Sequence, residues 1–245
     1  MAIKALNTSN IEAQRVFGVV GGYSETGKTT LAGTLPKENT IIISVEAGTL
    51  ALAGTGHTVW ECETLTDYKW CMEALRKGVD VTTGEPLKFE VKNLFVDSIS
   101  ELLYKKFAEV EIAVKAKEEV LQKKLTFDLY GDFFREAIAI VKELRDFTKY
   151  NIWMSCLIRK EKDGTVFTDV WDLNGQKIQS KWKALFDFIF ITDVEKTEEG
   201  EIKYSLICKG TEHELAKSRD RFNRLQPKEE ADLSKIINKI LQLED

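Results

Sequence analysis

The sequence predicts an α/β fold, in which a mostly parallel sheet is flanked by helices and carries an antiparallel hairpin at one edge. Three observations lead to this prediction. Short β-branched runs recur along the 245 residues, and several are apolar at consecutive positions, as in strands buried on both faces of a parallel sheet. Helical patterns lie between these runs, and such alternation is typical of wound parallel sheets. A glycine-rich turn joins the first strand to the first helix.

The elements are expected in a regular order along the chain. Strands are predicted over residues 16–20, 40–45, 58–62, 91–97, 151–158, 186–194 and 201–209. Helices are predicted over residues 28–35, 66–78, 99–124, 131–150 and 228–243, the last introduced by Pro227. The polar segment around Gly200 joins the last two strands and predicts the hairpin. Because no repeat or linker is apparent, we expect one domain over residues 1–245, with a core over about 16–222 and a C-terminal helix over about 227–243.

Composition limits the class of protein. With 43% hydrophobic and 31% charged residues, the chain can bury a large core. No apolar run reaches the roughly 18 residues that span a bilayer, and the N-terminus has no signal pattern. We therefore expect a cytoplasmic protein that is not bound to a membrane. The net charge of −5 argues against a surface coated with positive charge, although it permits local basic patches.

A phosphate-binding loop follows the first predicted strand. The segment VFGVVGGYSETGKTTLAG, residues 16–33, contains the full pattern G-x-x-x-x-G-K-[ST] from Gly22 to Thr29. Backbone N–H groups of such a loop bind the phosphates of a nucleoside triphosphate at a helix N-terminus. Lys28 is expected to reach the β- and γ-phosphates of ATP, and the Thr29 hydroxyl to bind Mg²⁺. The residues expected to contact the nucleotide are Gly22, Tyr23, Ser24, Glu25, Thr26, Gly27, Lys28, Thr29 and Thr30.

The second half of this site is expected at the end of another buried strand. In NLFVDSIS, Asp97 follows four residues of strand character, and it is predicted to order Mg²⁺ together with Thr29. The alternative is that Asp97 caps the following helix, since Asp and Ser both favour that position. Ring ATPases of the AAA type, and many helicases, place a catalytic Glu directly after this Asp, whereas here the neighbour is Ser98.

The base that activates water must therefore come from elsewhere. Glu46 ends the apolar run of TIIISVEAGTLAL, and a strand adjacent to the phosphate-loop strand would bring its carboxylate to the same sheet edge. The alternative is an exposed loop carboxylate without a catalytic role.

The order of these motifs resembles the RecA-like ATPases, in particular the compact P-loop proteins of bacteriophages that act as single-strand annealing or recombination factors. The likeness runs from about Val16 to the terminal helix and includes the Tyr-Gly pair at 130–131, the Gly-Lys loop near 175–177 and the strand at 186–194. One position departs from it. Where RecA proteins carry a Gln at the end of the sensor strand, this chain has the segment 155–157, Ser-Cys-Leu.

The resemblance also implies an oligomer. Hexameric helicases and related ATPases carry a K-x-R pair that enters the nucleotide site of the neighbouring subunit, and Lys217 and Arg219 match it here. An arginine in this role stabilises the negative charge that develops on the transferred phosphoryl group. We therefore predict a homo-oligomeric ring or filament. The alternative is a basic cluster on the solvated surface.

A surface for single-stranded DNA is expected in the segment 157–183. It interleaves aromatic with basic side chains, as single-strand binding requires, although acidic residues also occur there. The basic residues are Arg159, Lys160, Lys162, Lys177, Lys181 and Lys183, and the aromatic ones are Phe167, Trp171 and Trp182. Either Trp could instead pack in the core.

Together these patterns predict a magnesium-dependent ATPase that supports single-stranded DNA binding, annealing or recombination, of phage origin and active in the cytoplasm of a bacterial host. Its expected catalytic residues are Lys28, Glu46, Lys217 and Arg219, and its expected Mg²⁺ ligands are Thr29 and Asp97. The alternative is a nucleotide-gated scaffold or loader that recruits replication or packaging proteins. No N-K-x-D motif of a GTPase and no Arg-rich kinase lid is present in the sequence.

Overall fold

The computed structural model describes residues 15–46, 48–163, 166–174, 176–210, 215–220 and 222–243. The strands in these residues are β1 (Phe17–Gly22), β2 (Thr40–Ser44), β3 (Thr58–Glu61), β4 (Asn93–Asp97), β5 (Asn151–Asp163), β6 (Val166–Trp171), β7 (Phe188–Lys196), β8 (Ile202–Ile207), β9 (Lys217–Ser218) and β10 (Lys228–Glu230). The helices are α1 (Lys28–Ala32), α2 (Leu65–Lys77), α3 (Ile99–Leu121), α4 (Thr126–Asp146), α5 (Gln176–Leu185) and α6 (Leu233–Leu241), with short 3₁₀ turns η2 (Lys37–Asn39) and η3 (Thr49–Leu52).

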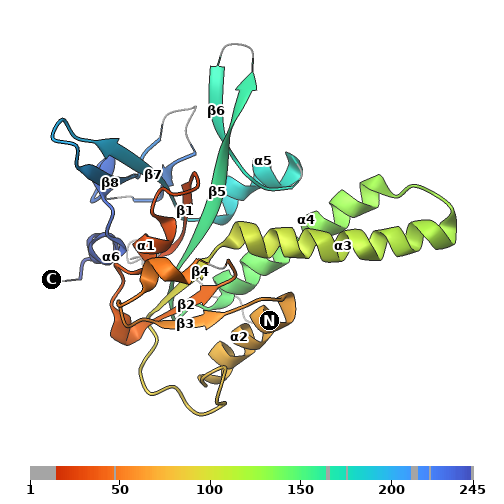
Figure 1. Ribbon diagram of the computed structural model, residues 1–245, viewed down its shortest axis with the longest axis horizontal. Helices are drawn as coiled ribbons and strands as arrows, with labels where there is room; N and C mark the ends of the chain where they lie inside the picture. Colours follow the sequence, from red (N-terminus) through yellow and green to blue (C-terminus); the bar gives the residue numbers. More distant parts are fainter. Residues whose placement is uncertain are drawn as a thin grey trace, which may run out of the picture.

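These strands form one mixed sheet (Figure 1). Its order is β10-β8-β7-β1-β5-β4-β2-β3, with β6 paired to β5 and β9 paired to β7. Every neighbouring pair from β7 to β3 is parallel. By contrast, β7 and β8 are antiparallel and are joined by a turn in which Gly200 has a φ of 87°. The predicted mostly parallel sheet with an antiparallel hairpin is therefore confirmed.

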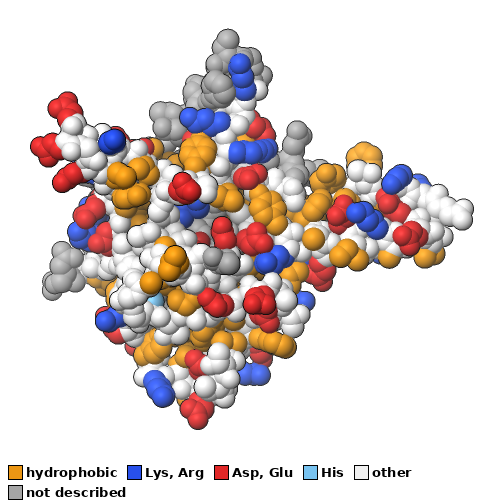
Figure 2. Space-filling view, viewed as in Figure 1, with side chains coloured by type: hydrophobic (Ala, Val, Ile, Leu, Met, Phe, Trp, Pro, Cys, Tyr) orange, Lys and Arg blue, Asp and Glu red, His pale blue; other side chains and the backbone are white. Residues whose placement is uncertain are grey.

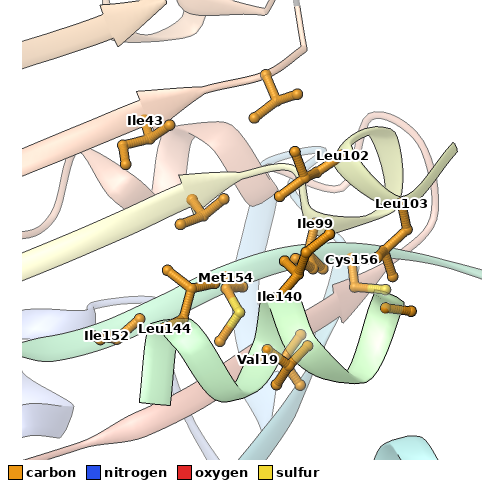
Figure 3. Packing of buried hydrophobic residues seen from close by; sticks show 14 of the residues in the cluster. Val19, Ile43, Ile99, Leu102, Leu103, Ile140, Leu144, Ile152, Met154 and Cys156 are labelled. Atoms are coloured by element: carbon orange, nitrogen blue, oxygen red, sulfur yellow. The ribbon is translucent and has the colours of Figure 1, made fainter. Parts of the chain in front are cut away.

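Helices cover both faces of the sheet because successive strand residues point to opposite sides. In β2, Ile41 and Ile43 face the core formed with α2 to α5, whereas Ile42 faces the core formed with α1 and α6. Figure 3 shows part of the first core, where Met154 of β5 lies close to residues of α3 and α4 such as Ile99. The buried central strands thus hold their carboxyl ends at a common edge.

The helices α3 and α4 form a hairpin whose far end extends away from the body (Figure 1). At its other end, α3 begins after Ser98, whose hydroxyl accepts a hydrogen bond from the N–H of Glu101. Several apolar side chains of the hairpin are exposed, among them Val120 (83% exposed) and Phe127 (96% exposed). No helix in the described residues is long and apolar enough to cross a lipid bilayer.

Some element boundaries differ from the prediction. The final helix does not follow Pro227, because residues 228–230 pair with β8 as β10. The helix α6 starts only at Leu233, where the side chain of Asp232 accepts from the Lys235 N–H. The elements β6, α5, β9 and β10 were not predicted from the sequence. That residues 1–245 form a single domain stays a prediction.

The close contact between β1 and β5 allows a test of the core. A Cβ atom at Gly18 would lie 2.3 Å from the ring of Trp153. We expect Gly18→Ala to lower the free energy of unfolding by about 1–3 kcal/mol, because overpacking forces side chains and backbone to shift. Urea unfolding measures this change. The control is Gly131→Ala in α4, where a Cβ would meet no heavy atom within 4 Å. Equal urea midpoints for the two variants would contradict the prediction.

Candidate functional site

The phosphate loop leaves β1 at Gly22 and ends at the first residue of α1. No side chain fits at Gly22, since a Cβ there would lie 2.1 Å from the hydroxyl of Thr192 and 2.5 Å from that of Thr26. Gly27 has a φ of 82°, a conformation that favours glycine. Around these glycines the loop is open to solvent. Tyr23, Thr26, Gly27 and Thr29 are half-buried, and Ser24, Glu25 and Thr30 are exposed.

Lys28 lies at the first position of α1 and is largely buried. Its Nζ atom donates a hydrogen bond to the carbonyl oxygen of Tyr23 at 2.5 Å, and the hydroxyl of Thr26 donates to the same oxygen at 2.8 Å. Burial lowers the pKa of Lys28, and the nearby carboxylates of Glu46 and Asp97 oppose this shift. The lysine is thus held inside the loop, close to two acidic groups.

Thr29 and Asp97 meet although they are 68 residues apart. The Thr29 hydroxyl donates to Oδ2 of Asp97 at 2.6 Å, and the hydroxyl of Ser155 in β5 donates to Oδ1 of the same carboxylate. Asp97 is only 2% exposed. The cap of α3 is Ser98, so the alternative role of Asp97 as the helix cap is wrong. The peptide bond between Asp97 and Ser98 is cis.

Glu46 lies at the same edge, but not for the expected reason. The prediction that its strand is adjacent to the phosphate-loop strand is wrong, because β5 and β4 lie between β1 and β2. The strands are parallel, however, and Ser44 pairs with Asp97, so the chain reaches the common edge two residues before Glu46. The backbone N–H of Glu46 donates to the Asp97 carbonyl at 3.2 Å. The register of β2 therefore brings the exposed Glu46 beside the Asp97 backbone.

Glu46 also lines a cavity of about 430 Å³ together with acidic residues of neighbouring elements, including Glu61, Glu63 and Glu101. Acidic side chains gather near the middle of the face shown in Figure 2. Lys105 lines the same cavity and forms a salt bridge with Glu101 at 3.1 Å. This cavity gives water a route to the Glu46 carboxylate.

Lys217 and Arg219 lie away from the phosphate loop of their own chain. Lys217 pairs with Ile189 near the start of β7, and β7 begins opposite Gly18, at the amino end of β1. The Lys217 ammonium donates to the carbonyl oxygens of Lys183 and Phe186 at 2.8 and 2.9 Å. Arg219 donates to the Asp187 carboxylate at 2.6 Å. Within one chain, these two side chains are thus joined to the end of the sheet opposite the loop.

Sequence reasoning missed the residues that β7 and β8 bring to the site. The Thr192 hydroxyl, from β7, donates to Oγ1 of Thr26 at 2.7 Å and so supports the loop from the neighbouring strand. Tyr204 of β8 lies against Gly27 and lines a cavity of about 190 Å³ beside the start of α1, with apolar walls that include Leu31 and Leu206. Only the pairing of β7 and β8 beside β1 reveals these residues.

The hairpin of β5 and β6 carries the segment expected to bind DNA. Figure 2 shows Lys and Arg side chains along the projection where Figure 1 places these strands. Trp171 and Trp182, however, are 1% and 0% exposed and pack edge to face with ring centroids 6.4 Å apart. DNA bases therefore cannot stack on these two tryptophan side chains. The side chains of Phe167 and Lys177 lie outside the described part of the chain.

The chain is similar to solved structures of low sequence identity. One is the RadB recombinase, at 14% identity with a TM-score of 0.41, covering 78% of this chain and 87% of that chain. Another is the flagellar accessory protein FlaH from Methanocaldococcus jannaschii, at 14% identity with a TM-score of 0.39, covering 87% of this chain and 83% of that chain. No curated protein matches the sequence.

A family model described as an AAA domain matches residues 15–222. The matched part contains the phosphate loop, Asp97 and Glu46. It also contains Ser98, at the position where ring ATPases of the AAA type carry a Glu. The match to the AAA domain therefore does not depend on a Glu at this position. Because the match covers most of the sequence, the chain belongs to the AAA domain family.

Proposed function

We propose that this protein binds ATP with Mg²⁺ at the phosphate loop and hydrolyses it. The observation that carries the proposal is the 2.6 Å contact between Thr29 and Asp97, which joins the loop to a carboxylate from a separate strand. A loop of this sequence needs such an acidic partner for its metal ion.

The residues present fit the magnesium ion and the triphosphate. The hydroxyl of Thr29 and the carboxylate of Asp97 are hard oxygen donors of the kind that Mg²⁺ prefers. Gly22, where a Cβ would clash with the hydroxyls of Thr192 in β7 and Thr26 in the loop, leaves the backbone without a side chain where the loop begins. When bound, Mg²⁺ neutralises charge on the phosphates. Ser155 holds the Asp97 carboxylate in position through the other oxygen.

Lys28 and Glu46 have separate roles in this proposal. Lys28 supplies a positive charge to the β- and γ-phosphates, and its charge is supported by the nearby carboxylates of Glu46 and Asp97. Glu46 orients the attacking water and accepts its proton, since it is exposed, lies beside the Asp97 backbone and lines a cavity open to solvent. The cavity beside Tyr204 receives the base of the nucleotide.

We also propose that single-stranded DNA binds along the β5–β6 hairpin. The basic residues Arg159, Lys160 and Lys162 follow one another on β5, at the edge of the sheet that holds the nucleotide site. With both tryptophans buried, the proposed contacts are chiefly between these side chains and DNA phosphates. A role in annealing or recombination, and a phage origin, stay predictions of the sequence.

Lys217 and Arg219 are proposed to act in the nucleotide site of a neighbouring subunit. They lie at the end of β1 opposite the phosphate loop. This position is compatible with contact to a nucleotide in a neighbouring subunit but not to a nucleotide bound by the same chain. Arg219 is half exposed and would have to exchange its present partner Asp187 for the phosphate of the neighbour. In this proposal the protein works as a ring or filament.

A second candidate function is a nucleotide-gated scaffold. It is favoured by the projecting α3–α4 hairpin, where apolar side chains such as Ile112, Val120 and Phe127 are exposed. A scaffold would bind ATP and recruit a protein to this hairpin, with little hydrolysis.

The first prediction from this proposal concerns the base. We expect Glu46→Gln to lower ATP turnover at least about 100-fold while nucleotide affinity stays within a few-fold, because a general base contributes about 10²–10⁴ to the rate. Phosphate release and binding of a fluorescent ATP analogue measure the two quantities. Glu63→Gln, in the same cavity, is the control and should retain turnover. Full activity in Glu46→Gln would favour the scaffold or a different base.

The second prediction concerns the subunit contact. Arg219→Ala is expected to lower turnover by about 10³ or more, as for other arginines of this kind. Mixing it with Lys28→Ala should restore part of the activity, because each variant supplies the group that the other lacks. Asp187→Asn is the control, since it removes the partner of Arg219 within the chain but keeps the arginine. If mixing restores nothing and Asp187→Asn is as inactive as Arg219→Ala, the arginine is structural.

The third prediction concerns DNA. We expect a fluorescein-labelled oligothymidylate to bind in the presence of Mg-ATP, with light scattering reporting assembly on the DNA. Lys162→Glu should weaken binding, and the slope of log K against log salt should fall by about 0.7 for each lost phosphate contact. Lys115→Glu on α3 changes the net charge equally and is the control. Equal binding by both variants, or nucleotide-dependent assembly without DNA affinity, would contradict a DNA site on the hairpin.

A further inference from the structure

The β5–β6 hairpin stands directly beside the phosphate loop. Leu157 of β5 pairs with Gly22, the last residue of β1. Beyond this point β5 continues through residues 158–163, where it pairs with β6. In Figure 1 the two strands rise above the sheet edge next to the end of β1. Side chains of the phosphate loop can therefore contact the hairpin directly.

Tyr23 provides such a contact. Its hydroxyl donates a hydrogen bond to Oδ1 of Asp169 on β6 at 2.5 Å. Lys160 of β5 is the register partner of Asp169, and its ammonium lies 5.9 Å from the centre of the Tyr23 ring, within the range of a cation–π contact. Burial and the hydrogen bond to the Asp169 carboxylate raise the pKa of Tyr23 above its ordinary value. One side chain of the phosphate loop is thus held by both strands of the hairpin.

The backbone of the same residue contacts the lysine of the loop. The Tyr23 carbonyl accepts hydrogen bonds from Lys28 and Thr26. If the Lys28 ammonium pairs with phosphates, as proposed above, its contact with this carbonyl weakens or is lost. Tyr23 therefore links the two sites: its carbonyl oxygen contacts Lys28, and its hydroxyl contacts Asp169 of the hairpin.

We propose that the hydrogen bond between Tyr23 and Asp169 couples the occupancy of the phosphate loop to the β5–β6 hairpin, with Asp169 acting as a positioning residue for the loop. The inference rests on the proposed binding of a nucleoside triphosphate. Phosphates that order the loop restrict Tyr23, and Tyr23 in turn restricts β6 through Asp169. The hairpin then becomes more rigid when the nucleotide is bound.

Amide hydrogen exchange of residues 158–163 and 166–171 tests this coupling. With Mg²⁺ and a slowly hydrolysed thio analogue of ATP, we expect exchange in the wild-type hairpin to slow several-fold. Tyr23→Phe and Asp169→Ala should both abolish this change, and Asp169→Ala should still bind a fluorescent ATP analogue, because Asp169 lies on β6 outside the phosphate loop. Asp169→Asn, which keeps an acceptor oxygen, should restore part of it. The control is Tyr104→Phe, which removes a hydroxyl that donates to the Asp172 carbonyl, just beyond β6 and outside the phosphate loop.

A second measurement needs no nucleotide. In the free protein, Tyr23→Phe and Asp169→Ala should each speed hairpin exchange roughly tenfold, as expected for loss of a hydrogen bond to a charged group. The double variant should be no faster than either single variant, because both changes remove the same bond.

The outcomes separate the two proposals. If the wild-type protein binds the analogue but hairpin exchange does not change, or if Tyr23→Phe keeps the full response, the coupling is wrong. If the protein binds no nucleotide, the proposed function fails. In the nucleotide-free protein, additive effects of the two substitutions on hairpin exchange would show that Tyr23 and Asp169 do not act through one hydrogen bond, and the coupling would be wrong.

Discussion

The hydrogen bond between Thr29 and Asp97 is the contact on which the site depends. It joins the first turn of α1, the helix that follows β1, to the end of β4, and in the sheet β5 lies between β1 and β4. The contact requires that β1, β5 and β4 run parallel, because only then do their carboxyl ends lie at one edge. It also requires a buried carboxylate whose second oxygen is satisfied, and Ser155 of the intervening strand supplies that donor. β4, β5 and the helix that follows β1 thus present one polar side chain each to the same small region.

The two hydrophobic cores keep this edge in place. Each central strand contributes alternate residues to the faces covered by α2–α5 and by α1 with α6, so a strand cannot slip by one residue without exposing apolar side chains. The close packing of Trp153 over Gly18 restricts β1 in the same way. A rigid sheet below and a loop of short polar contacts above are a common arrangement for a binding site, since loops carry the chemistry and the scaffold positions them.

The phosphate loop and the α3–α4 hairpin differ in how the rest of the molecule contacts them. The phosphate loop receives one hydrogen bond from Thr192 of β7 and donates one to Asp169 of β6, and each contact comes from a strand that is distant from the loop in sequence. The α3–α4 hairpin, in contrast, extends away from the body and exposes apolar side chains along its length (Figure 1). The molecule therefore combines a phosphate loop held by hydrogen bonds with two strands and two projecting hairpins, β5–β6 and α3–α4, whose surfaces other molecules can reach.

The strand–helix alternation, the phosphate loop and the pairing of that loop with Asp97 can be predicted from local patterns and from a motif whose chemistry needs an acid. The strand order cannot, so the predicted neighbour of the phosphate-loop strand is wrong. The predicted helix start after Pro227 is wrong as well, because β10 intervenes. Burial of Trp171 and Trp182, the support of the loop by Thr192 and the contact of Tyr23 with Asp169 were decided only by the tertiary structure. The physical reason is that each depends on which strands pair across long sequence separations, and local propensity carries no information about that choice.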